Sequence, residues 1–134
     1  MTNKILIVDD EPHMLRVTEL SLKKAGYEII TARNGREAIN LAVIHLPALI
    51  VMDVSMPEMD GLTALRELKG NPATEAIPVI MLTTRGQNMT RAEAERSGAA
   101  LYITKPFSPS ALAAEARRIM PLAAPAVPVG AIPT

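Results

Sequence analysis

The sequence has no cysteine and no tryptophan, and two Tyr and one Phe are its aromatic residues. Without cysteine, disulfide bonds and thiolate-bound metals are excluded. The 14 basic and 14 acidic residues balance to a net charge of zero, so the composition does not indicate a nucleic-acid-binding surface. No apolar run approaches the roughly 20 residues that cross a bilayer, and the first residues lack an apolar signal segment. We therefore expect a cytoplasmic protein without direct nucleic-acid or membrane contact.

The length of 134 residues fits one domain with one core. Because aromatic residues are so few, the aliphatic residues and methionine must fill that core. We expect the domain to occupy residues 1–120. Residues 121–134 are rich in Pro and Ala and carry no charge, which is typical of a flexible tail or of a cut linker.

Short apolar runs alternate with helical patterns along the chain. The runs predict strands over residues 5–8, 28–32, 48–52, 79–82 and 101–104. Helix starts are indicated at Pro12, Asn34, Gly61 and Ser108-Pro109, and a further helix with a weak apolar face is expected over residues 90–97. His45 lies on the apolar face of the second helix and is expected at the edge of the core. Five βα units predict a doubly wound α/β fold with a parallel sheet.

The strand order follows from which runs are apolar throughout. The first, third and fourth runs are the most apolar and should be central, whereas residues 28–32 and 101–104 are more polar and should form the edges. The order 2-1-3-4-5 meets this requirement and is one of the common doubly wound orders. In that order the ligand-binding crevice lies between the first and third strands.

Polar groups follow four of the five runs at their downstream ends. Asp9 and Asp10 follow the first run, Asp53 the third, Thr83 the fourth and Lys105 the fifth. Parallel strands bring these ends to one edge of the sheet, where open α/β sheets bind ligands. Taken singly, each residue has an ordinary explanation as a helix cap, a turn, a loop hydroxyl or a solvated side chain. None of these explanations accounts for all of them at one edge.

The chemistry of this set favours a divalent cation and a phosphoryl group. Three close carboxylates repel one another, and Mg²⁺ takes oxygen ligands from one or two carboxylates together with waters and phosphate oxygens. Lys105 supplies a second positive charge, and Thr83 offers a donor to a phosphoryl oxygen. One of the carboxylates can itself act as a nucleophile and form an acyl phosphate.

At this point the residues match a known family. The chain resembles the receiver domain of two-component response regulators from Lys4 to about Met120, and the resemblance implies a flavodoxin-like (βα)5 sandwich. It rests on four motifs at specific spacings: Val8-Asp9-Asp10-Glu11-Pro12, Asp53 with Met56-Pro57-Glu58-Met59-Asp60-Gly61, Leu82-Thr83, and Tyr102 with Lys105-Pro106-Phe107.

The resemblance implies a role for each site residue. Asp53 is the phosphate acceptor and binds Mg²⁺ together with Asp10 and the backbone carbonyl of Ser55, while Asp9 holds the ion mainly through water. Lys105 pairs with the phosphoryl group. Thr83 is the switch hydroxyl and Tyr102 the switch aromatic. Pro106 is similar to the family's proline that often follows the lysine through a cis peptide.

Three positions bear on the lifetime or accessibility of the phosphoryl group. Thr84 stands where the family usually has a small residue, and it is expected to narrow access to the phosphoryl group. Ser55 and Arg85 occupy the two positions that tune how fast the phosphate is lost in this family. The sequence leaves open whether Arg85 shields the phosphoryl group or steers water.

By this resemblance the chain is a signalling switch and not an enzyme, apart from catalysing its own phosphorylation and dephosphorylation. The phosphoryl donor is a sensor histidine kinase or a phosphotransfer protein. The face made by the fourth helix, fifth strand and last helix controls an unknown output partner, and a homodimer on phosphorylation is possible. Three alternatives stay open: a small Mg²⁺-dependent aspartyl-phosphate phosphohydrolase, a pseudo-receiver that binds partners without phosphate, and a flavin or nucleotide binder. The chain lacks the G-x-G-x-x-G and P-loop motifs that would favour the last alternative.

Overall fold

The structure, a computed structural model, describes residues 3–54, 56, 59–83 and 96–120. Strands and helices alternate from β1 to β4: β1 (Lys4–Val8), α1 (Pro12–Lys24), β2 (Glu28–Ala32), α2 (Gly35–His45), β3 (Leu49–Asp53), α3 (Gly61–Lys69) and β4 (Val79–Thr83). The next elements described are β5 (Leu101–Thr104) and α5 (Pro109–Ile119). All strand pairs are parallel, and the sheet order is β2-β1-β3-β4-β5. The predicted doubly wound α/β fold and its strand order are therefore confirmed.

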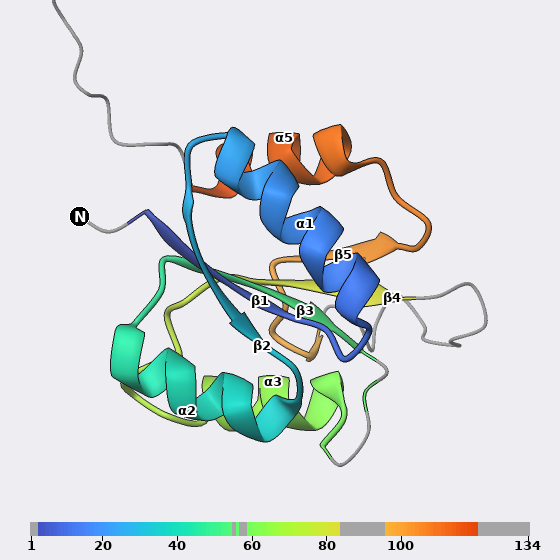
Figure 1. Ribbon diagram of the computed structural model, residues 1–134. Coiled ribbons are helices and arrows are strands. Elements are labelled where there is room, and N and C mark those ends of the chain that lie inside the picture. The colour runs from blue at the N-terminus through green and yellow to red at the C-terminus, as the bar shows by residue number, and fades with distance from the viewer. Residues whose placement is uncertain (1–2, 55, 57–58, 84–95, 121–134) are drawn as a thin grey trace, which may run out of the picture.

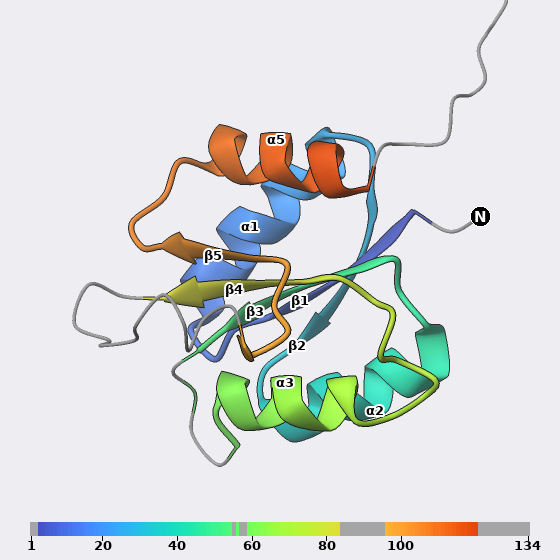
Figure 2. The same cartoon turned by 180° about the vertical axis from the view of Figure 1, so that it is seen from behind.

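Helices cover both faces of the sheet. Figures 1 and 2 show α1 and α5 together on one face, and α2 and α3 together on the other. Of the helix predicted over residues 90–97, residues 90–95 lie outside the described residues, as does the Pro- and Ala-rich segment 121–134. Among the helices that the structure describes, none is both long and apolar enough to cross a membrane.

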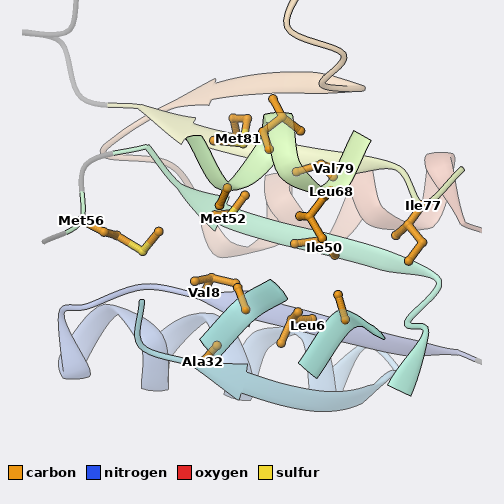
Figure 3. Packing of buried hydrophobic residues seen from close by; sticks show 14 of the residues in the cluster. Leu6, Val8, Ala32, Ile50, Met52, Met56, Leu68, Ile77, Val79 and Met81 are labelled. Atoms are coloured by element: carbon orange, nitrogen blue, oxygen red, sulfur yellow. The ribbon is translucent and has the colours of Figure 1, made fainter. Parts of the chain in front are cut away.

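The central strands are buried on both faces because each one contributes side chains to two hydrophobic clusters. In β1, Leu6 and Val8 belong to a cluster with α2 and α3, whereas Ile5 and Ile7 belong to a cluster with α1 and α5. We call these the α2/α3 cluster and the α1/α5 cluster. Figure 3 shows the first of them, with side chains from the sheet meeting those of α3. Successive side chains of a strand point to opposite faces, so a continuous apolar run fills both layers.

The edge strands are more exposed, as their sequences predict. Most residues of β2 and β5 are only partly buried, and Ala32 is the one fully buried residue of the two strands. By contrast, every residue of β3 is buried. The strands between which the ligand crevice is predicted, β1 and β3, are neighbours in the interior of the sheet.

Side-chain caps fix where the helices begin at the functional edge of the sheet. Asn34, Asp60 and Ser108 accept hydrogen bonds from the backbone N–H groups three residues further on, at 2.8, 2.8 and 3.4 Å. The α1 helix is capped by Glu11, whose Oε1 accepts from the Met14 N–H at 2.6 Å. His45 is exposed at the end of α2, so the prediction that it lies at the edge of the core is wrong.

Candidate functional site

Three carboxylates converge at the carboxyl ends of β1 and β3. Val8 pairs with Met52 in the sheet, and the residues that follow this pair are Asp9 and Asp53. Asp9 is 1% exposed and Asp53 is 5% exposed, while Asp10 is half-buried. One carboxylate oxygen from each of the three residues lies within 4.8 Å of the others. The strand register, and not local sequence, thus creates a cluster of hard oxygen ligands that suits a small divalent cation.

Lys105 brings a positive charge into this cluster from the far end of the chain. Its Nζ lies 3.2 Å from Asp9 Oδ2 and 3.4 Å from Asp53 Oδ2. The side chain is 16% exposed, so the ammonium group is largely withdrawn from water. The Lys105 backbone N–H donates to the Thr83 carbonyl and so joins the end of β5 to that of β4. The Lys105–Pro106 peptide bond is cis, as the resemblance implies.

Asp9 uses both of its carboxylate oxygens within the protein. Oδ1 accepts from the backbone N–H of Glu11 at 3.0 Å, and Oδ2 contacts Lys105. The ordinary explanation for Asp9 and Asp10, that one of them caps the first helix, is wrong because Glu11 occupies the cap position. Asp9 is instead a buried carboxylate with a hydrogen-bond partner on each oxygen, the state in which a buried charge is tolerated.

Gly61 sets the approach of α3 to the end of β3. Its N–H donates to the Val54 carbonyl at 2.8 Å. A Cβ atom built on Gly61 would lie 2.2 Å from the Asp53 carbonyl oxygen and 2.8 Å from the Val54 Cα. No side chain fits there without moving backbone. The sequence marks Gly61 as a helix start but gives no sign of this close contact with the backbone of Asp53.

Thr83 and Tyr102 lie on one face of neighbouring strands. Thr83 pairs with Thr104, and Tyr102 pairs with Met81. Since side chains alternate along a strand, Thr83 and Tyr102 are both on the α2/α3 side, where Met81 is buried and Tyr102 packs against the α2/α3 cluster. The Tyr102 hydroxyl donates to Ser97 Oγ at 2.8 Å, a partner that sequence reasoning missed. Ser55, Thr84 and Arg85 lie outside the described residues.

The comparison with protein families gives the same reading as the geometry. The profile of the response regulator receiver domain matches residues 5–117. The chain belongs to the response regulator receiver domains. Receiver domains are signalling switches that bind Mg²⁺ at an acidic pocket, and Asp9, Asp10 and Asp53 form such an acidic cluster here.

Known relatives of this receiver domain differ in their named roles. The transcriptional regulatory protein SrrA of Staphylococcus aureus is 44% identical over 109 residues, which cover 81% of this chain and 44% of SrrA. The chain therefore matches less than half the length of the curated relatives. The family profile and the match to SrrA identify a response regulator receiver domain of two-component signalling.

Solved structures of similar sequence have the same fold. The chemotaxis response regulator CheY4 of Vibrio cholerae matches with a TM-score of 0.81 and 32% identity, over 90% of this chain and 100% of that one. The signal receiver domain of a histidine kinase from Syntrophus aciditrophicus matches with a TM-score of 0.82 and 35% identity, over 96% and 99% of the two chains. One receiver architecture thus occurs in proteins named for transcription, chemotaxis and kinase signalling.

Proposed function

We propose that this receiver domain accepts a phosphoryl group on Asp53 and passes the signal on through a change near Thr83 and Tyr102. The observation that carries the proposal is the convergence of the Asp53 carboxylate with Asp9, Asp10 and the Lys105 ammonium. Phosphoryl transfer depends mainly on positioning and on neutralising charge. This site supplies both, because the nucleophile is fixed at a strand end and a cation is already in contact with it.

The donor set fits Mg²⁺, and Asp10 and Asp53 are the carboxylates that would hold it. Both oxygens of Asp9 already have partners, which supports a contribution through its charge and through water. The Ser55 backbone carbonyl remains a predicted third ligand. When bound, Mg²⁺ supplies positive charge to the acidic cluster and to the phosphoryl oxygens.

The reaction is a displacement at phosphorus. A carboxylate oxygen of Asp53 attacks the phosphorus of phosphohistidine in a kinase or phosphotransfer protein; the new P–O bond forms as the P–N bond breaks. The imidazole leaves with the bonding electron pair and takes a proton from solvent. Lys105 remains beside Asp53 and stabilises the added negative charge. Hydrolysis reverses the state: water attacks phosphorus, inorganic phosphate leaves, and the Asp53 carboxylate is restored.

The phosphoryl group adds about 1.5–2 negative charges and new acceptor oxygens. These attract the Thr83 hydroxyl, which lies at the end of the strand next to β3. Because Thr83 and Tyr102 share one face of β4 and β5, movement of Thr83 changes the packing space available to Tyr102. The face around β5 and α5 then presents a different surface to an output partner or to a second copy of the chain.

The chain matches less than half of SrrA, so the output of the receiver domain is a separate prediction. Control of an output partner, homodimer formation on phosphorylation and a cytoplasmic location are predictions. So are the effects of Ser55, Thr84 and Arg85 on phosphoryl lifetime. A phosphohydrolase acting on added substrates and a pseudo-receiver are the alternatives, and both are separated from the proposal by the experiment below.

Intact mass spectrometry after incubation with acetyl phosphate tests the proposal. We expect a gain of one phosphoryl group that requires Mg²⁺ and disappears in the Asp53→Asn variant. A pseudo-receiver would show no gain with acetyl phosphate or with a phosphorylated kinase domain. A phosphohydrolase would release phosphate from added phosphomonoesters over many turnovers, which can be measured in the same samples.

A further inference from the structure

Ser97 holds the hydroxyl of Tyr102 at the start of the strand that carries the switch aromatic. The Tyr102 hydroxyl donates to Ser97 Oγ at 2.8 Å. The same Ser97 oxygen accepts from the backbone N–H of Ala99 at 3.3 Å. Both groups are partly buried, so water competes for this hydrogen bond less than at an exposed site. Tyr102 therefore has a polar partner at its tip and apolar partners around its ring.

The turn that carries Ser97 lies beside the end of α3. Gly98 has φ +91°, and a Cβ built on it would lie 3.2 Å from the Lys69 Cγ at the end of α3. The Lys69 Nζ donates to the carbonyls of Glu75 and Ile77, at 3.0 and 2.7 Å. The Lys69 side chain therefore lies beside Gly98 and is itself tied to the loop between α3 and β4.

We propose that Ser97 is a positioning residue that holds Tyr102 in the orientation seen in the structure, and that this orientation opposes switching. The inference rests on the proposed function, because it assumes that Tyr102 moves when Asp53 is phosphorylated. If the hydrogen bond is present before switching and absent afterwards, removing it favours the switched state. Linkage then requires that a phosphoryl mimic, which binds the switched state, binds more tightly by the factor by which the switched state is favoured.

Beryllofluoride with Mg²⁺ serves as the phosphoryl mimic, and four proteins form the test: wild type, Ser97→Ala, Tyr102→Phe and the double variant. Each single variant removes one side of the hydrogen bond between Tyr102 and Ser97, and Ser97→Ala also removes the acceptor of the Ala99 N–H. We expect each to bind beryllofluoride about fivefold more tightly, which corresponds to about 1 kcal/mol for one hydrogen bond. The double variant should gain no more than either single variant, since the second change removes nothing further. Ser97→Thr keeps the hydroxyl and should restore the wild-type affinity.

Fluorine NMR of protein labelled with 3-fluorotyrosine tests the contact without any phosphoryl mimic. The chain has two tyrosines, so the Tyr27 signal is an internal control and the Tyr102 signal is the reporter. We expect Ser97→Ala to shift the Tyr102 signal and to leave the Tyr27 signal in place. This shift reports the contact itself, whereas the gain in beryllofluoride affinity reports its effect on switching.

The two ideas fail in different ways. If wild type does not bind beryllofluoride in the presence of Mg²⁺, the proposed function is overturned, and the regulatory role of Ser97 with it. If wild type binds but Ser97→Ala changes neither the affinity nor the Tyr102 signal, the Ser97 inference alone is overturned. Additive effects of the two single variants would also contradict it, because the two hydroxyls would then act independently.

Discussion

Replacing Asp10 with Asn should stabilise the metal-free receiver domain. The acidic cluster combines three carboxylates with the single ammonium of Lys105, which lies against Asp9 and Asp53. Asp10 therefore adds a third negative charge next to two that already share one positive partner. The Asn side chain has nearly the same shape, so packing is preserved while the repulsion is removed.

The size of the effect follows from the separation of the charges. Oxygens of the three carboxylates lie within 4.8 Å of one another. At that distance, repulsion between two unit charges ranges from about 1 kcal/mol in water to about 3–4 kcal/mol at a dielectric constant near 20. Attraction of Asp10 to Lys105 offsets part of this. We expect Asp10→Asn to raise the free energy of unfolding by about 1 kcal/mol.

Asp9→Asn is the matched control, because it removes the same charge from a different position. Asp9 contacts Lys105 at 3.2 Å and is almost fully buried. Its loss removes a favourable ion pair along with the repulsion, so this variant should be less stable than Asp10→Asn. Removing one partner of a buried pair typically costs about 3–5 kcal/mol, and we expect a smaller net cost here because Asp53 still pairs with Lys105.

Urea unfolding in a chelator at low salt measures these differences. Added Mg²⁺ should stabilise wild type, by an amount that rises with the ratio of Mg²⁺ concentration to its dissociation constant, and should stabilise Asp10→Asn much less. The advantage of Asp10→Asn should also shrink in about 1 M salt, which screens charges beyond about 3 Å. An Asp10→Asn variant no more stable than wild type in the chelator would refute the reasoning.

Three further predictions follow from other contacts. Gly61→Ala should lose about 1–3 kcal/mol of stability, because the added Cβ would lie 2.2 Å from a backbone oxygen. Gly70→Ala at the other end of α3, where the closest contact would be 3.3 Å, should change stability far less. Equal urea midpoints for the two variants would contradict this prediction. Burial raises the pKa of Tyr27 above its ordinary value of about 10, and the charge of Arg117 offsets part of this rise. Because the unfolded chain loses this proton at a lower pH than the folded one, the free energy of unfolding should fall as pH rises past about 10. Tyr27→Phe should make the free energy of unfolding fall less steeply with pH, and an unchanged pH dependence would contradict the assignment to Tyr27. Thr83→Ala should still be phosphorylated at Asp53 but should lose the Tyr102 response in fluorine NMR; a full response would remove Thr83 from the switch.

The fold follows from sequence patterns to an unusual degree, because the strands of a parallel sheet are short and apolar throughout. Continuous runs such as residues 48–52 predict burial on both faces, and β3 is buried along its whole length. The more polar edge strands then leave few strand orders open. Polar residues that follow the runs, such as Asp53 and Lys105, come together because parallel strands end at one edge.

Contacts that depend on close approach between distant segments were beyond sequence reasoning. The tight contact of Gly61 with the backbone of Asp53 is set by how α3 docks on the sheet. Ser97 gives no local signal of its bond to Tyr102, because a serine near a helix end is equally typical of a turn. The capping role of Glu11 was missed because shorter acidic residues precede it and are the more common caps.

Locating the phosphoryl group at a single residue tests the central claim most directly. Borohydride reduces an acyl phosphate to an alcohol, so treatment of the phosphorylated protein converts the modified aspartate to homoserine, which tandem mass spectrometry can locate in a peptide. We predict homoserine at position 53, dependent on Mg²⁺ and on the phosphoryl donor. Homoserine at position 9 or 10 with position 53 unchanged, or a phosphorylated protein that borohydride leaves unaltered, would contradict the assignment of Asp53 as the acceptor.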